Sequence, residues 1–110
     1  MALYDTLSKA LDEKDAGRYT HLFHEDYEFV RHHTGTSMHQ EQMVEMMKMM
    51  MVNEKVVIRD ARCVYENEEI LVEHSVIDFP DGTTEAVMAV HKLQDGKIIR
   101  TETGATLIPK

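Results

Sequence analysis

The amino-acid sequence predicts an α+β domain in which helices from the first half of the chain pack on an antiparallel sheet from the second half. Apolar residues of the first half recur at helical spacing, whereas the second half alternates apolar and polar residues with a period of two. Short turn motifs separate the predicted strands, and parallel neighbours would need crossovers of about a dozen residues. The sequence therefore predicts an antiparallel meander. The length of 110 residues fits a single domain spanning residues 1–110.

The first helix is predicted from Leu3, Leu7 and Leu11, which share one face and leave charged residues on the other. Asp15 is a suitable N-cap for a second, short helix. The apolar side of that helix is expected to extend to Phe23.

A strand is predicted over residues 27–32, which are aromatic, β-branched or polar in alternation. The segment 34–36 contains Gly35 and breaks this strand. Ser37 and Gln40 have the spacing of a capping box, so a third helix is expected to begin there and to end near Val52.

The second half contains four candidate strands and two strong turn motifs. The strands are predicted over residues 56–66, 69–79, 83–93 and 97–107. Turns are predicted at residues 80–82 and 94–96, where Asp-Gly pairs favour tight reversals. If both are three-residue loops with a glycine bulge, Phe79 lies opposite Thr83 and Leu93 lies opposite Lys97.

This register brings polar residues together on one face of the sheet. Leu71 is expected opposite His91, and Glu73 opposite Ala89, which in turn faces Thr101. Glu73, His91 and Thr101 then share a face. A slip of one residue in either hairpin would separate them.

Apolar residues occur on both faces of the meander. Val72, Val76 and Val90 point one way, whereas Leu71 and Ile77 point the other. The helices can cover one face only. A second copy of the chain is the simplest cover for the other face, so the sequence predicts a homodimer that packs sheet against sheet.

Composition excludes several partner classes. The formal net charge of −8 argues against nucleic acid and against anionic membrane surfaces. No apolar stretch is long enough to span a bilayer, and the lone Cys63 allows no internal disulfide. We therefore expect a cytoplasmic protein. Cys63 itself is expected to be a buried apolar residue.

Two segments resemble the nuclear transport factor 2-like superfamily, which includes the SnoaL-like and ketosteroid-isomerase-like proteins. The first is LFHEDYEFVRHHTG, residues 22–35, and the second is VMAVHKLQDGKIIRTE, residues 87–102. The resemblance covers nearly the whole chain. It implies three N-terminal helices packed on a strongly curved, mixed and mostly antiparallel sheet, the cystatin-like cone. The same fold hosts isomerases, dehydratases, cyclases, hydrolases and plain binding domains, so it implies no single activity.

The sequence departs from the ketosteroid isomerases at the positions that carry their reaction. By the resemblance, their helix-one tyrosine falls at Leu7, with Tyr4 one turn earlier. Their aspartate base falls at Arg31 or its neighbour His32, and their buried acid falls near Ala89. None of these matches, so that particular reaction is not expected.

The candidate site joins the polar residues of the meander with those that end the first predicted strand. His33, Glu73 and His91 form a carboxylate–imidazole set suited to general acid–base catalysis. Ligand-binding residues are predicted at Arg31, His32, Met47 and Thr101. The alternative for these side chains is an ion-pair network at a rim or an interface, because such networks also use charged residues.

Methionines crowd the third predicted helix. Met43, Met46, Met47 and Met50 share a face, and thioethers can bind Cu(I), but an apolar helix face over a sheet explains them better. No H-E-x-x-H spacing occurs, and neither a metal site nor a cofactor is predicted.

Three functions stay open at this point. The first is a dimeric domain that binds a small apolar or carboxylate-bearing ligand. The second is a cofactor-free isomerase or lyase that acts on a small, mostly apolar carbonyl compound by His/Glu acid–base catalysis. The third is a structural domain whose open sheet pairs with another protein.

Overall fold

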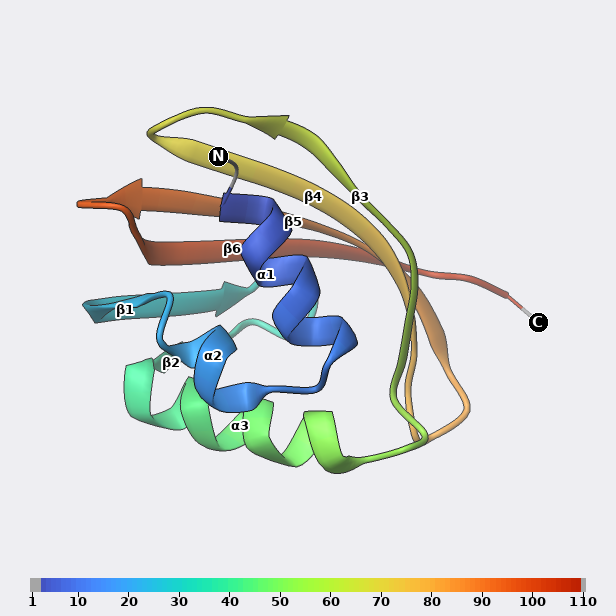
Figure 1. Ribbon diagram of the computed structural model, residues 1–110. Coiled ribbons are helices and arrows are strands. Elements are labelled where there is room, and N and C mark those ends of the chain that lie inside the picture. The colour runs from blue at the N-terminus through green and yellow to red at the C-terminus, as the bar shows by residue number, and fades with distance from the viewer. Residues whose placement is uncertain (1–2, 110) are drawn as a thin grey trace.

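Helices cover one side of a six-stranded sheet in the computed structural model, which describes residues 3–109 (Figure 1). The elements in chain order are α1 (Leu3–Asp12), α2 (Ala16–Thr20), β1 (Phe23–Arg31), β2 (Thr36–His39), α3 (Gln40–Val52), β3 (Val57–Glu66), β4 (Ile70–Asp78), β5 (Thr84–Gln94) and β6 (Lys97–Leu107). The predicted α+β class and the four long strands of the second half are confirmed.

The sheet has the strand order β2-β1-β6-β5-β4-β3. Strands β3 to β6 form the predicted antiparallel meander, and β1 joins its β6 edge in parallel. The long strands bend around the helices, so α1 and α3 lie in the hollow of the sheet (Figure 1). This side of the sheet is called the inner face below, and the opposite side is called the outer face.

The core lies between the helices and the inner face. Its largest fully buried side chains are Leu7 of α1, Tyr27 of β1, Leu71 of β4 and Ile98 of β6. From α3, the residues at four-residue spacing, Met43, Met47 and Met51, complete it. The methionine-rich face is therefore mainly core, as expected for a helix that packs on a sheet.

The second helix is shorter than predicted. Asp15 caps it as expected, since its carboxylate accepts from the Arg18 backbone N–H at 3.0 Å. Phe23, however, begins β1 instead of ending the helix. Its ring stacks on Tyr27 at a centroid distance of 4.1 Å and packs edge-on against Tyr19. This aromatic packing, together with pairing to β6, draws the chain into the sheet four positions before the predicted strand.

The predicted capping box at Ser37 and Gln40 is wrong. Ser37 lies in β2 and pairs with Val30, so its backbone is extended. Helix α3 begins at Gln40, and the Gln42 side chain accepts a hydrogen bond from the His39 backbone N–H at 3.0 Å. A turn tight enough to return the chain along β1 creates the short β2, which the sequence pattern did not indicate. The helix ends at Val52 as predicted.

The predicted register of the β4–β5 hairpin is confirmed, and that of the β5–β6 hairpin differs. Phe79 donates its backbone N–H to the Thr83 carbonyl at 2.9 Å, as a three-residue loop requires. In the β5–β6 hairpin, Gln94 pairs with Lys97, which leaves a two-residue loop. Its residues Asp95 and Gly96 have φ values of 55° and 75°, the left-handed conformations of a type I′ turn.

A bulge corrects the effect of this shorter turn on the sheet faces. The β5–β6 register shifts again between Lys92 and Leu93, so Ala89 pairs with Thr103 instead of Thr101. The turn and the bulge each displace the register by one residue. Because side chains alternate with a period of two, their sum returns every residue to its predicted face.

Cys63 is exposed in β3, so the prediction of a buried cysteine is wrong. Strand β3 is one edge of the sheet, its pairing with β4 is interrupted twice, and most of its side chains are exposed. Within residues 3–109, no helix is long and apolar enough to cross a membrane.

Candidate functional site

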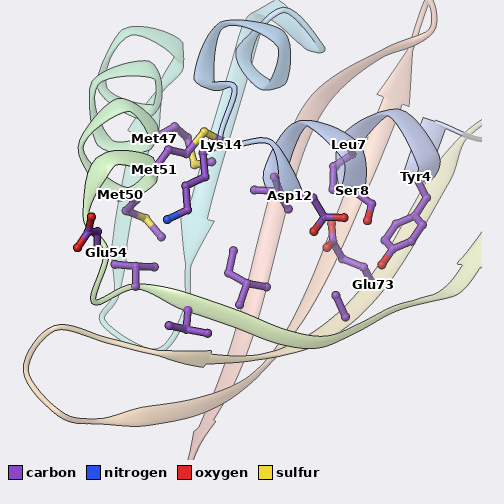
Figure 2. A pocket seen from close by; sticks show the side chains of 15 residues that line it. Tyr4, Leu7, Ser8, Asp12, Lys14, Met47, Met50, Met51, Glu54 and Glu73 are labelled. Atoms are coloured by element: carbon purple, nitrogen blue, oxygen red, sulfur yellow. The ribbon is translucent and has the colours of Figure 1, made fainter.

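A cavity of about 260 Å³ lies between α1, the end of α3 and the first half of β3 (Figure 2). Its lining residues are Tyr4, Leu7, Ser8, Leu11, Asp12, Lys14, Met47, Met50, Met51, Glu54, Val56, Val57, Ile58, Ala61 and Glu73. Tyr4, Ser8, Asp12 and Glu73 gather at one end, and the three methionines lie at the other (Figure 2). The cavity therefore has a polar end and a methionine-lined end, and Lys14 and Glu54 lie beside the methionines (Figure 2).

Helix α1 supplies one wall because its residues at three- and four-residue spacing face the same way. Tyr4, Leu7, Ser8 and Leu11 follow this spacing. The Glu66 carboxylate of β3 accepts hydrogen bonds from the backbone N–H groups of Leu3 at 2.7 Å and Tyr4 at 3.3 Å. This contact caps the helix and fixes its first turn against the sheet.

Glu73 of β4 lies at the polar end of the cavity and is 9% exposed. Its Oε2 accepts a hydrogen bond from His91 Nε2 of β5 at 2.5 Å. The described residues provide no hydrogen bond to its other oxygen, Oε1. Glu73 lines the cavity, so its carboxylate is within reach of a bound molecule.

His91 is buried behind Glu73 and does not line the cavity. Its Nδ1 lies 2.8 Å from Thr101 Oγ1 of β6. When neutral His91 donates from Nε2 to the carboxylate, its Nδ1 accepts from the threonine hydroxyl. The chain Thr101–His91–Glu73 thus holds the carboxylate in one orientation, and Glu73 is its member at the cavity wall.

Tyr4 of α1 brings a phenolic hydroxyl to the cavity lining. Burial raises the pKa of its hydroxyl, and the negative charges of Glu73 and, more weakly, Asp12 raise it further. A hydrogen bond with Ser8 acts in the opposite direction. The hydroxyl therefore keeps its proton at neutral pH and is able to donate into the polar end.

The structure does not bring His33 to Glu73 and His91. His33 Nε2 lies 3.6 Å from Glu85 Oε2, and Arg31 Nη2 lies 3.2 Å from Glu85 Oε1. Glu85 is 5% exposed, so this is a partly buried ion-pair cluster at the end of β1. The Arg31 guanidinium also stands 5.8 Å from the Phe79 ring centroid.

His32 lies away from the cavity as well. Its Nε2 is hydrogen-bonded to Glu102 Oε1 at 2.9 Å, and Glu102 Oε2 accepts a hydrogen bond from Arg100 Nε at 3.1 Å. These two partners lower the pKa of the Glu102 carboxyl, His32 most strongly. Glu102 pairs with Val90 in the sheet and lies on the outer face. Of the predicted ligand-binding residues, Met47 lines the cavity. Thr101 does not line it and is connected to Glu73 by hydrogen bonds through His91.

Tyr4, Asp12 and Lys14 were not predicted as site residues. The usable signal was the face of α1, since Tyr4, Ser8 and Asp12 are spaced four apart. Among residues 3–109, no three His, Cys, Asp or Glu side chains group as a metal site.

Comparison with known proteins places this geometry in a family. Residues 4–101 match the model of the SnoaL-like domain. An NTF2-like protein of unknown function from Cytophaga hutchinsonii is 16% identical, with a TM-score of 0.73 and coverage of 94% of this chain and 87% of that one. An NTF-2 like protein of unknown function from Burkholderia xenovorans is 10% identical, with a TM-score of 0.75 and coverage of 97% and 82%.

A protein from Sphaerobacter thermophilus is also similar, at 14% identity, a TM-score of 0.72 and coverage of 96% of this chain and 97% of that one. These identities show a shared fold. The comparison with curated proteins found no match. The family match spans most of the sequence and agrees with the curved sheet and its N-terminal helices, so the chain belongs to the SnoaL-like domain family within the nuclear transport factor 2-like superfamily.

Proposed function

We propose that this domain binds a small, mostly apolar molecule in the cavity between α1, α3 and β3. The observation that carries the proposal is a cavity of about 260 Å³ that combines a methionine-lined end with the buried Glu73 carboxylate. Ligand sites typically join an apolar wall to a few oriented polar groups. The proposed ligand is small, because the cavity is below the usual range of roughly 300–1,000 Å³.

A cavity-filling variant tests this proposal. Ala61 lines the cavity from the exposed strand β3, so Ala61→Phe should occupy part of it without removing core contacts. A ligand found by screening for thermal stabilisation should bind the native domain and fail to bind this variant. Val64→Phe is the matched control, since Val64 lies on the same strand, is 49% exposed and does not line the cavity. Equal binding to both variants would place the ligand elsewhere.

Acid–base catalysis on a small carbonyl compound is the second candidate. It is supported by the 2.5 Å contact of Glu73 with His91 and by the protonated Tyr4 hydroxyl nearby. In this scheme Glu73 removes a proton from the carbon beside the carbonyl, while Tyr4 donates a hydrogen bond to the carbonyl oxygen. Return of that proton to another carbon gives an isomerase. Departure of a β-leaving group gives a lyase.

This scheme assigns His91 the positioning of Glu73, and it assigns no proton transfer to His33, which contacts Glu85. The test is deuterium incorporation from D₂O into small β,γ-unsaturated ketones and hydroxyketones, followed by NMR. Glu73→Gln keeps the side-chain shape and should abolish incorporation, and Tyr4→Phe should slow it by roughly 10²-fold or more. Unchanged incorporation in Glu73→Gln would remove Glu73 as the base.

We also propose that the outer face of the sheet forms a homodimer interface. Apolar side chains on this face include Val72, Val76, Val90 and Met88, and they lie beside the polar His74 and Glu102. Met88 is 42% exposed, and the Nδ1 atom of its partner His74 is buried without a hydrogen bond from the described residues. A second copy would cover Met88.

A further inference from the structure

We infer that the cavity selects a positively charged ligand: a small alkylammonium ion with its nitrogen at Glu73 and Asp12 and its hydrocarbon part against the methionines. This inference rests on the proposed ligand-binding function, and it names the chemical class of the ligand. The alternatives are a neutral and an anionic molecule of the same shape.

The first step is the charge of the lining. Three carboxylates, Asp12, Glu54 and Glu73, face one ammonium group, Lys14. The chain as a whole has a formal net charge of −8. Both the local and the total charge repel an anion and attract a cation. A carboxylate-bearing ligand, which the sequence left open, is therefore disfavoured.

The second step is the hydrogen bonding of the Glu73 carboxylate. Glu73 is 9% exposed, and its hydrogen bond to His91 occupies Oε2. A carboxylate oxygen removed from bulk water is stabilised when a donor occupies it. Oε1 receives no hydrogen bond from the described residues, and Glu73 lines the cavity. An ammonium group supplies both the N–H donors and the compensating charge.

The third step is the position of the charges along the cavity. The charges of Glu73 and Asp12 both act on the Tyr4 hydroxyl, so both carboxylates lie within electrostatic reach of the same end. The Lys14 ammonium points toward the methionine end instead (Figure 2). The Glu54 carboxylate also lies beside the methionines, so Lys14 and Glu54 place opposite charges at that end, and Asp12 and Glu73 place two negative charges at the other (Figure 2). A molecule with one cationic head and one apolar body matches this arrangement.

Three molecules of nearly the same shape test the inference. Cyclohexylmethylammonium, cyclohexylmethanol and cyclohexanecarboxylate carry a positive, a zero and a negative charge. Each is titrated into the protein labelled with ¹³C at the methionine methyl groups, because Met47, Met50 and Met51 line the cavity. We expect the ammonium ion to bind roughly tenfold more tightly than the alcohol and the carboxylate to bind most weakly.

The variant Asp12→Asn isolates the contribution of charge. It should reduce the preference for the ammonium ion over the alcohol roughly threefold or more, because it removes one negative charge and keeps the size of the side chain. Glu41→Gln removes the same charge from an exposed site in the first turn of α3, outside the lining, and should change neither affinity. Asp12 is exposed, so both variants are expected to fold.

Two outcomes separate the inference from the function beneath it. If the alcohol binds the native protein as tightly as the ammonium ion, the inference is overturned and the cavity remains a binding site. If none of the three compounds shifts the methionine signals, the inference and the proposed ligand-binding function both fail.

Discussion

At the residue scale, the Glu73 carboxylate owes its orientation to a hydrogen-bonded chain that crosses three strands. Glu73, His91 and Thr101 lie on β4, β5 and β6, and their contacts measure 2.5 and 2.8 Å. His91 is 2% exposed and Thr101 is 3% exposed, so water does not replace a lost partner easily. Polar networks of this kind are stabilising when every member is satisfied.

Thr101→Val tests this network through stability. Valine keeps the volume of threonine and removes the hydroxyl, which leaves His91 Nδ1 buried without its partner. We expect the free energy of unfolding to fall by about 1–2 kcal/mol, measured by urea denaturation. Thr106→Val, on the exposed part of the same strand, should change it by less than about 0.5 kcal/mol. Equal effects of the two substitutions would show that the hydroxyl contributes nothing specific.

The buried tyrosines predict how stability depends on alkaline pH. Burial raises the pKa of Tyr19 and of Tyr27 above the ordinary value of 10.0. As the pH rises past that value, the unfolded chain releases these protons while the folded chain retains them. The free energy of unfolding should therefore be constant near neutrality and fall above about pH 10. In urea denaturation, Tyr19→Phe should make this fall shallower, and an unchanged slope would exclude Tyr19 as its source.

At the element scale, the position of α1 depends on a contact from the far end of β3. Glu66 accepts hydrogen bonds from the N–H groups of Leu3 and Tyr4, and a carboxylate at a helix N-terminus also interacts favourably with the helix dipole. Since α1 provides the Tyr4 wall of the cavity, this cap connects helix stability to the site.

Glu66→Ala should lower the free energy of unfolding by about 1 kcal/mol, because two backbone donors lose their acceptor. The same variant should weaken ligand binding in the cavity by displacing Tyr4. Glu68→Ala, two residues further along and exposed, provides the control for removal of a carboxylate. A thermal melt and a ligand titration measure both effects, and wild-type behaviour in the first variant would rule out the cap.

At the scale of the whole molecule, the two faces of the sheet have different environments. The inner face packs on the helices and encloses the cavity, whereas the outer face carries the exposed Met88 near the half-buried Val72, Val76 and Val90. Stable dimers of small proteins commonly bury about 1,200–2,000 Å² in total.

Met88→Glu should disrupt the proposed homodimer, because it places a charge at the centre of the outer face. Sedimentation should show a dimer for the native chain. For the variant, the dissociation constant of the dimer should be roughly tenfold higher or more. Met49→Glu, on the solvent side of α3 where Met49 is 71% exposed, should leave the dimer intact. A native chain that sediments as a monomer would contradict the proposal.

The sequence by itself determined the class of the fold, the four long strands and the shared face of Glu73, His91 and Thr101. These follow from local signals: periodicity, turn residues and alternation along each strand. The face assignment was correct although the β5–β6 turn was not, because a two-residue turn and a bulge at Lys92 shift the register by one residue each and the side-chain period is two.

The tertiary structure alone decided which residues enclose a cavity. Tyr4 and Asp12 meet Glu73 only because β3 and β4 bend around α1, and this curvature is a property of the assembled sheet that no local pattern encodes. The same packing places His33 beside Glu85 and Ser37 in β2. Contacts between elements far apart in the chain depend on the summed geometry of every element between them, which is why the polar end of the cavity was not apparent before the fold was known.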